Sequence, residues 1–237
     1  MKKLPPDKRL IVALDVPTFA EAGVYVRRLS PVVQNFKVGI ELFAHSGPEV
    51  IENIRSAGGS VFLDLKFFDI PNTMAGAVRS AAALHPFLLN VHALAGPEAM
   101  RECVKAAGKK KNRPKLLAVT ILTSFNASEM QKARITGPVD EAVLKLAGSA
   151  LKSGMDGVVA SPREAAKLRK KFGRKFLIVT PGVRPKWAGK NDQKRVTTPF
   201  EAIKNGADYI VVGRPILKAS DCAEAARKII GEIERAE

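Results

Sequence analysis

The sequence predicts a (β/α)8 barrel, and three observations carry that prediction. Short apolar runs rich in β-branched residues alternate with longer amphipathic segments along all 237 residues. About eight such units fit in this length, as they do in a (β/α)8 barrel. Polar residues recur at the carboxyl ends of the runs. An open doubly wound sheet uses the same alternation, but no GxGxxG or P-loop motif follows the first run.

The eight apolar runs are expected to be strands of a parallel sheet. Each is continuous rather than alternating with polar residues, which is typical of strands buried on both faces. They cover residues 10–14, 36–40, 61–65, 87–91, 116–122, 157–160, 176–180 and 209–213.

The segments between the runs have helical spacing. Residues 18–29 begin with Thr18 and carry Glu21 three positions later, a capping box. Proline or an acidic residue opens the segments 97–107, 140–153 and 162–172, and an amphipathic segment closes the chain at 221–235. No linker rich in Pro, Gly or Ser divides the sequence, so we expect residues 1–237 to form a single domain.

The composition fits a globular enzyme without disulfides. Hydrophobic residues make up 46% and charged residues 26% of the chain. Cys103 and Cys222 have neither CxxC spacing nor a nearby histidine cluster, which argues against a zinc site and suits a reducing compartment. No run approaches the ~20 apolar residues of a transmembrane helix, and the N-terminus does not resemble a signal peptide. We expect a cytoplasmic protein without a membrane partner.

The net charge of +16 is high for a small-molecule enzyme. It could indicate nucleic acid, an anionic membrane or a phosphorylated substrate. The basic residues are spread along the chain, and two tyrosines and one tryptophan are too few for a base-stacking platform. We therefore favour a solvated basic surface and expect no nucleic-acid partner.

Polar or charged residues end nearly every predicted strand. In a barrel these positions meet at the face where the loops build the active site. A single such residue would be an ordinary loop charge, but the recurrence favours a functional site. The residues are Asp15, Lys37, Asp64, Lys66, His92, Thr123, Ser124, Arg184, Gly213 and Arg214.

The third strand carries the sharpest signal. Asp64 and Lys66 are two positions apart, so on a strand they point to the same side. Burying both charges is costly unless they pair with each other. Such a pair could be a structural salt bridge at the barrel rim rather than part of a catalytic site. With Lys37 and Asp69 they could form an alternating network, which would hold a lysine protonated and aimed as a proton donor. His92 is expected to be a packed strand-end histidine.

Phosphate binding is the second signal. Loops after the seventh and eighth strands form the usual phosphate site of a barrel, and here they carry Arg184 and Arg214. Gly182 and Gly213 would let the backbone approach an anion closely. The polar segment 184–195 has the composition of a mobile lid.

The chain resembles the bacterial orotidine 5′-phosphate decarboxylase family along nearly its whole length, and several motifs carry this resemblance. The most specific is Asp64-Leu-Lys66-Phe-Phe-Asp69-Ile-Pro-Asn-Thr73. The others are Ala-Leu-Asp15, Phe-Lys37-Val-Gly, Val-Thr-Ile-Leu-Thr123-Ser124, Thr-Pro-Gly-Val-Arg184-Pro, Asp192-Gln193-Lys-Arg and Val-Gly213-Arg214-Pro-Ile.

The resemblance implies decarboxylation of orotidine 5′-monophosphate to uridine 5′-monophosphate in de novo pyrimidine synthesis, without a cofactor or a metal. Lys66 would protonate C6, Asp64 would lie against the substrate carboxylate, and Lys37 would hold the charged array and the ribose.

The remaining roles also follow from the resemblance. Asp15 would bind a ribose hydroxyl, and Asp69 and Thr73 would reach the neighbouring subunit's site in a homodimer. Contacts to the base and phosphate are implied for Thr123, Ser124, Arg184, Gln193, Gly213 and Arg214.

Two rival functions remain. A hexulose-phosphate synthase or keto-gulonate-phosphate decarboxylase shares a similar DxK element but works through a magnesium-stabilised enediolate. Ile-Pro-Asn-Thr73 and Gln193 favour the orotidylate reading. A basic nucleic-acid-binding barrel without catalysis would instead bind RNA or DNA with steep salt dependence.

Overall fold

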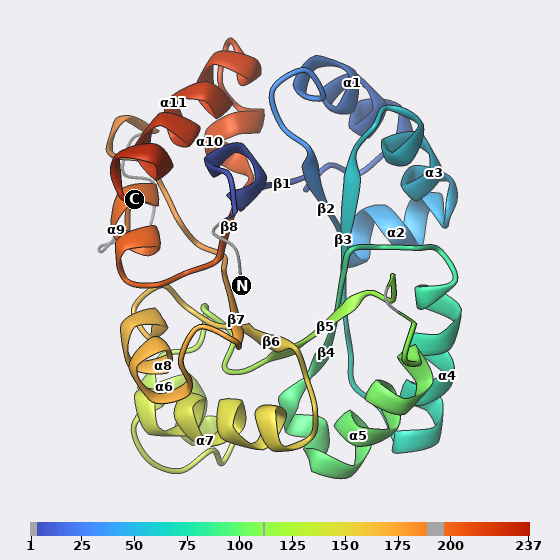
Figure 1. Ribbon diagram of the computed structural model, residues 1–237, viewed down its shortest axis with the longest axis vertical. Coiled ribbons are helices and arrows are strands. Elements are labelled where there is room, and N and C mark those ends of the chain that lie inside the picture. The colour runs from blue at the N-terminus through green and yellow to red at the C-terminus, as the bar shows by residue number, and fades with distance from the viewer. Residues whose placement is uncertain (1–3, 111, 189–196) are drawn as a thin grey trace.

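The computed structural model describes residues 4–110, 112–188 and 197–237. Its eight parallel strands pair in sequence order, from β1 to β8, and close into a barrel. Figure 1 looks along this barrel and shows the helices arranged around it. The predicted (β/α)8 fold is therefore confirmed. The strands are β1 (Leu10–Ala13), β2 (Asn35–Gly39), β3 (Ser60–Phe67), β4 (Leu88–His92), β5 (Lys115–Val119), β6 (Gly157–Val159), β7 (Leu177–Thr180) and β8 (Tyr209–Val212).

The strands are buried on both faces, as their continuous apolar runs predict. One set of side chains, including Ile11, Phe62 and Val179, fills the inside of the barrel. The alternate set, including Val12 and Phe36, packs outward against the helices. Because every strand runs in the same direction, all strand carboxyl ends open at one end of the barrel.

Most helices and short 3-10 turns lie in the connections between strands, while η1 precedes β1 and α10 and α11 follow β8. The helices and turns are η1 (Pro6–Arg9), α1 (Phe19–Leu29), α2 (Ile40–Ser46), α3 (Glu49–Ser56), α4 (Pro71–Ala82), η2 (Ala93–Ala95), α5 (Gly96–Ala107), α6 (Ala127–Lys132), α7 (Val139–Lys152), α8 (Ala165–Phe172), η3 (Lys186–Ala188), α9 (Pro199–Lys204), α10 (Arg214–Leu217) and α11 (Cys222–Arg235).

Local sequence signals explain most helix starts. The hydroxyl of Thr18 accepts a hydrogen bond from the Glu21 amide at 3.3 Å and so caps α1. Asp221 caps α11 by accepting from two backbone amides. Helix α8 begins at Ala165, three residues later than predicted, because the chain turns through Pro162 before Glu164 occupies the N-cap.

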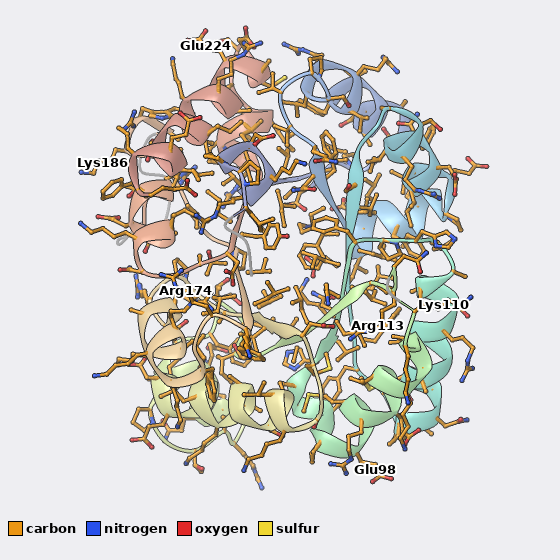
Figure 2. All side chains as sticks on the ribbon, in the orientation of Figure 1. Glu98, Lys110, Arg113, Arg174, Lys186 and Glu224 are labelled. Atoms are coloured by element: carbon orange, nitrogen blue, oxygen red, sulfur yellow. The ribbon has the colours of Figure 1, made fainter. Side chains whose placement is uncertain are left out.

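Charged side chains are spread around the molecule. Figure 2 shows Glu98, Lys110, Arg174, Lys186 and Glu224 at widely separated places around the barrel. Both cysteines are buried free thiols, in agreement with the expected lack of a disulfide. No helix in the described ranges has the length and apolar character needed to cross a membrane.

Candidate functional site

Four charged side chains form a chain of ion pairs at the carboxyl end of the barrel. Lys37 Nζ lies 2.8 Å from Asp15 Oδ1 and 3.4 Å from Asp64 Oδ2. Lys66 Nζ lies 2.8 Å from the other Asp64 oxygen, Oδ1. The alternating network expected from the sequence thus forms for Lys37, Asp64 and Lys66, but with Asp15 in place of the expected Asp69. We call Asp15, Lys37, Asp64 and Lys66 the charge array.

The interior of the charge array is largely shielded from water. The side chains of Lys37 and Asp64 are each 11% exposed, whereas that of Lys66 is 32% exposed. Burial alone would raise the pKa of Asp64, but the ammonium groups of Lys37 and Lys66 outweigh it and hold that pKa below its usual range. Asp64 therefore stays ionised at neutral pH.

The pKa of Lys37 moves in the opposite direction. Burial would lower it, but the carboxylates of Asp64 and Asp15 outweigh burial and raise it. The two shifts agree with each other, since each partner stabilises the charged form of the other. Lys37 and Asp64 consequently keep their opposite charges across the neutral range.

An asparagine braces the array from the neighbouring strand. Asn90 on β4 is fully buried, and its Nδ2 donates to Asp64 Oδ1 at 2.6 Å. Its Oδ1 accepts from the Lys66 backbone amide at 2.8 Å. Sequence reasoning missed Asn90, although an amide inside the apolar run 87–91 needs a buried partner and could have pointed to it.

His92 lies beside the array as a packed residue. Its ring stacks on Phe68 with centroids 5.4 Å apart, and its Nδ1 accepts from the Leu94 amide at 3.3 Å. Burial, and then the nearby charge of Lys66, lower the pKa of His92. These contacts match the expectation of a strand-end histidine with a structural role.

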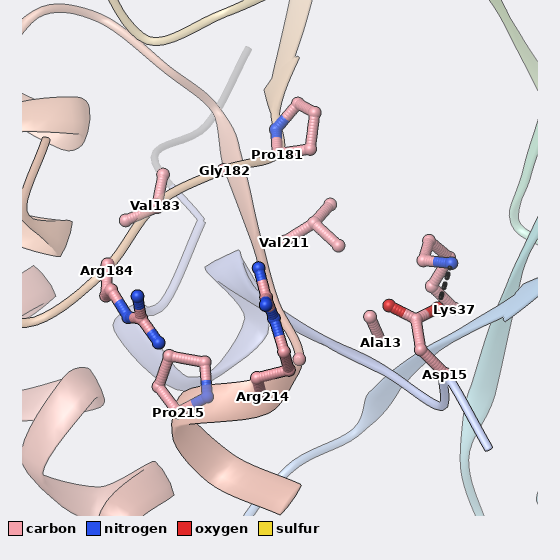
Figure 3. A pocket seen from close by; sticks show the side chains of 11 residues that line it. Ala13, Asp15, Lys37, Pro181, Gly182, Val183, Arg184, Val211, Arg214 and Pro215 are labelled. Carbon is pink, nitrogen blue, oxygen red and sulfur yellow. Dashed lines mark hydrogen bonds and ion pairs between the residues drawn. The ribbon is translucent and has the colours of Figure 1, made fainter. Parts of the chain in front are cut away.

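A cavity of about 170 Å³ lies between the array and the last two barrel loops. Figure 3 shows Arg184 and Arg214 on one side of it and the ion pair of Asp15 with Lys37 on the other. Gly213 also lines this cavity, and a Cβ there would come within 3.3 Å of Asp15 Oδ2. The absence of a side chain therefore keeps the cavity open at this point.

A second cavity, of about 220 Å³, reaches the end of the array formed by Asp64 and Lys66. Asp64 and Lys66 line it together with Asp15 and Lys37, which also line the first cavity. The ion pair of Asp15 with Lys37 is thus part of the lining of both cavities. This arrangement offers two arginines for an anion at one end and a lysine with a carboxylate at the other.

The remaining predicted site residues lie outside these two linings. Asp69, Thr73, Thr123 and Ser124 are exposed, and Asp69 Oδ1 accepts from the neighbouring Ile70 amide at 2.7 Å. Among the described residues no ion pair joins Asp69 to the array. Gln193 lies outside the described residues. In the part of the chain that the structure describes, no group of three or more His, Cys, Asp or Glu side chains could hold a metal ion.

Comparison with known proteins assigns the chain to a family. Residues 8–229 match the model of the orotidine 5′-phosphate decarboxylase / HUMPS family. The chain belongs to this family. Proteins named orotidine 5′-phosphate decarboxylase from Pelobacter propionicus and Geotalea daltonii are 50% and 51% identical to it over 228 residues, which is 95% of this chain and of each relative.

Solved structures agree with this assignment. The crystal structure of orotidine 5′-phosphate decarboxylase from Lactobacillus acidophilus matches with a TM-score of 0.84 and 38% identity, over 95% of this chain and 99% of that one. An uncharacterized conserved protein from Geobacillus kaustophilus matches with a TM-score of 0.83 and 34% identity, over 94% and 99%.

Proposed function

We propose that this chain decarboxylates orotidine 5′-monophosphate to uridine 5′-monophosphate and carbon dioxide without a cofactor, with Lys66 protonating C6. Family membership and the names of relatives about half identical to it support the activity, that of a carboxy-lyase in pyrimidine nucleotide synthesis. The observation that carries the finer chemistry is the charge array, in which Asp64 pairs with Lys66 at 2.8 Å.

The two cavities, which share Asp15 and Lys37 in their linings, suggest how the substrate lies. The phosphate would sit between Arg184 and Arg214, where guanidinium groups make charge-assisted hydrogen bonds to phosphate oxygens. The ribose hydroxyls would meet Asp15 and Lys37, which line both cavities. The pyrimidine would then place C6 and its carboxylate near Lys66 and Asp64.

The proposed step needs only a proton donor and a fixed electric field. The bond from C6 to the carboxylate breaks, its electron pair stays on C6, and carbon dioxide leaves. The Lys66 ammonium donates a proton to C6 and is later reprotonated from solvent. No adjacent carbonyl delocalises the carbanion, so a preorganised ammonium must stabilise it electrostatically. Asp64 aims that ammonium through its ion pair at 2.8 Å.

An exposed apolar strip supports a homodimer as the active form. Phe68 and Ile70 are 62% and 66% exposed. Ile40, at the start of α2 after β2, and Leu94, in η2 after β4, are also exposed. Clustered apolar exposure of this kind marks interaction surfaces. Asp69 lies within the strip, and we propose that it and Thr73 complete the partner's site.

The other predicted contacts fit the same pose but stay predictions. Thr123 and Ser124 form the exposed turn after β5 and would face the pyrimidine. Gln193 would bridge the base and the phosphate. We further propose that residues 1–237 form one domain, and that it acts in the cytoplasm.

Ultraviolet absorbance tests the proposal directly, because orotidylate and uridylate absorb differently. Purified protein with EDTA should convert orotidylate, and the matched Lys66→Ala protein should not. Absence of turnover by the wild-type protein would refute the proposal. Magnesium-dependent turnover of a sugar phosphate, with none of orotidylate, would favour the enediolate chemistry of the hexulose-phosphate synthases instead.

A further inference from the structure

Strand β3 is irregular at the charge array. Leu63 pairs with Leu89 on β4 and Phe67 pairs with Val91, so three residues of β3 lie against the single residue Asn90. At this break the backbone of Lys66 has φ of 50°, in the left-handed region that residues with a Cβ rarely adopt. The proposed proton donor therefore stands on a strained segment with an interrupted strand ladder.

The side chain of Asn90 bridges that interruption. Its carbonyl oxygen accepts from the Lys66 backbone amide at 2.8 Å, which restores a hydrogen bond that the broken ladder does not supply. Its amide nitrogen donates to Asp64 Oδ1 at 2.6 Å. The same Asp64 oxygen accepts from Lys66 Nζ at 2.8 Å. One fully buried amide thus holds both the main chain of Lys66 and the carboxylate that aims its side chain.

We propose that Asn90 is a positioning residue for the decarboxylation, fixing the Lys66 ammonium relative to Asp64 through the bulge in β3. This inference rests on the proposed function. An amide is suited to the task because it donates to a carboxylate and accepts from a backbone amide at the same time. Aliphatic residues do neither, and a carboxylate would repel Asp64.

The proposal separates turnover from binding. Asn90 lines neither cavity, and the arginines that would hold the phosphate lie on the far side of the array. Loss of its two hydrogen bonds should misplace the Lys66 ammonium but leave the phosphate contacts intact. A misplacement of about 1 Å can cost on the order of 100-fold in rate. Asn90→Ala should thus lower kcat by about 10- to 100-fold and change KM by less than about threefold.

A second buried asparagine provides the matched control. Asn35 on β2 is 5% exposed, and its Nδ2 donates to the Lys8 carbonyl at 2.8 Å, at the opposite end of the barrel. Asn35→Ala removes a comparable buried amide without touching the array. Both variants should lose thermal stability, and only Asn90→Ala should lose kcat. Equal effects of the two substitutions on kcat, or a kcat for Asn90→Ala within threefold of wild type, would overturn the proposal.

The isosteric variant Asn90→Asp covers the case in which Asn90→Ala fails to fold. At neutral pH its carboxylate would repel Asp64, and on acidification its protonated form could again donate to that oxygen. Its kcat relative to wild type should therefore rise as the pH falls. A relative kcat that is independent of pH contradicts the positioning role.

Amide hydrogen exchange does not depend on turnover, so it distinguishes failure of this inference from failure of the proposed function. The Lys66 amide proton should exchange with solvent much faster in Asn90→Ala than in wild type or Asn35→Ala. Unchanged exchange would refute the bracing contact even in an active enzyme. Inactive wild-type protein with the expected exchange pattern would refute the proposed function alone.

Discussion

Substitution of Asp64 by asparagine tests whether the charge array also stabilises the fold. In Asp64→Asn, Oδ1 of the new side chain can still accept from Asn90 and Lys66. The new amide nitrogen replaces Asp64 Oδ2, which lies 3.4 Å from Lys37 Nζ in the wild-type protein. Two donors would then oppose each other at a buried ammonium. We expect a clear loss of stability with little change in shape.

The magnitude follows from the ion pairs of Lys37. Removing one partner of a buried pair costs about 3–5 kcal/mol. Lys37 keeps Asp15 at 2.8 Å, and the pair with Lys66 contributes little because that lysine is 32% exposed. The loss should therefore lie near the lower end, at about 3 kcal/mol, which for a chain of this size lowers Tm by roughly 6–12 °C.

Urea unfolding of both proteins at several pH values measures this loss. Because the folded-state pKa of Asp64 is depressed, its contribution is present above its unfolded value of 3.8 and disappears as the pH falls through the folded value. The difference between the two proteins should be full at pH 7 and shrink below about pH 3.8. The matched control is Glu102→Gln, which breaks the exposed pair with Lys105 and should cost under about 1 kcal/mol. An Asp64→Asn protein as stable as wild type at pH 7 would show that the array does not stabilise the fold.

Three further predictions concern activity. Lys66→Ala should lower kcat by at least about 1,000-fold while uridylate affinity, measured by calorimetry, changes little; a near-wild-type rate excludes it as the proton donor. Arg214→Ala should weaken uridylate binding by about 10- to 100-fold but leave uridine binding unchanged, and equal weakening of both ligands would exclude a phosphate contact. Mixing inactive Lys66→Ala and Asp69→Ala subunits should restore up to about one quarter of wild-type activity if sites are shared in a dimer. Complete inactivity despite proven subunit exchange would contradict sharing.

The barrel could be predicted because its signals are local. Each strand is a continuous apolar run, and a run of this kind predicts a buried strand without knowledge of its tertiary contacts. The end of β5 was misjudged, since the apolar run continues to Leu122 while the strand ends at Val119. Hydrophobicity marks burial there, but it does not mark where strand pairing stops.

Three of the four members of the charge array could be predicted, but Asp69 was expected where the structure has Asp15. Parallel strands bring their carboxyl ends together, so Lys37, Asp64 and Lys66 had to be neighbours. The pairing of Lys37 with Asp15 at 2.8 Å, and the exposed position of Asp69 beside its own backbone, depend on loop conformations that no periodicity encodes.

The backbone of Lys66 is where sequence reasoning and structure differ most. Regular alternation predicts that Asp64 and Lys66 share a side, with their Cα atoms about 6–7 Å apart on an undisturbed strand. The bulge and the left-handed φ of 50° at Lys66 break that regularity, at a cost of roughly 1–2 kcal/mol for a residue with a Cβ. Lysine carries no local preference for this conformation, so tertiary contacts must stabilise it. Asn90 supplies one directly, by accepting from the Lys66 amide, and also donates to Asp64, the ion-pair partner of Lys66. Conflicts between local preference and overall fold concentrate at functional sites. The position of Lys66 therefore depends on the contacts of Asn90 from β4 as well as on its own strand, β3.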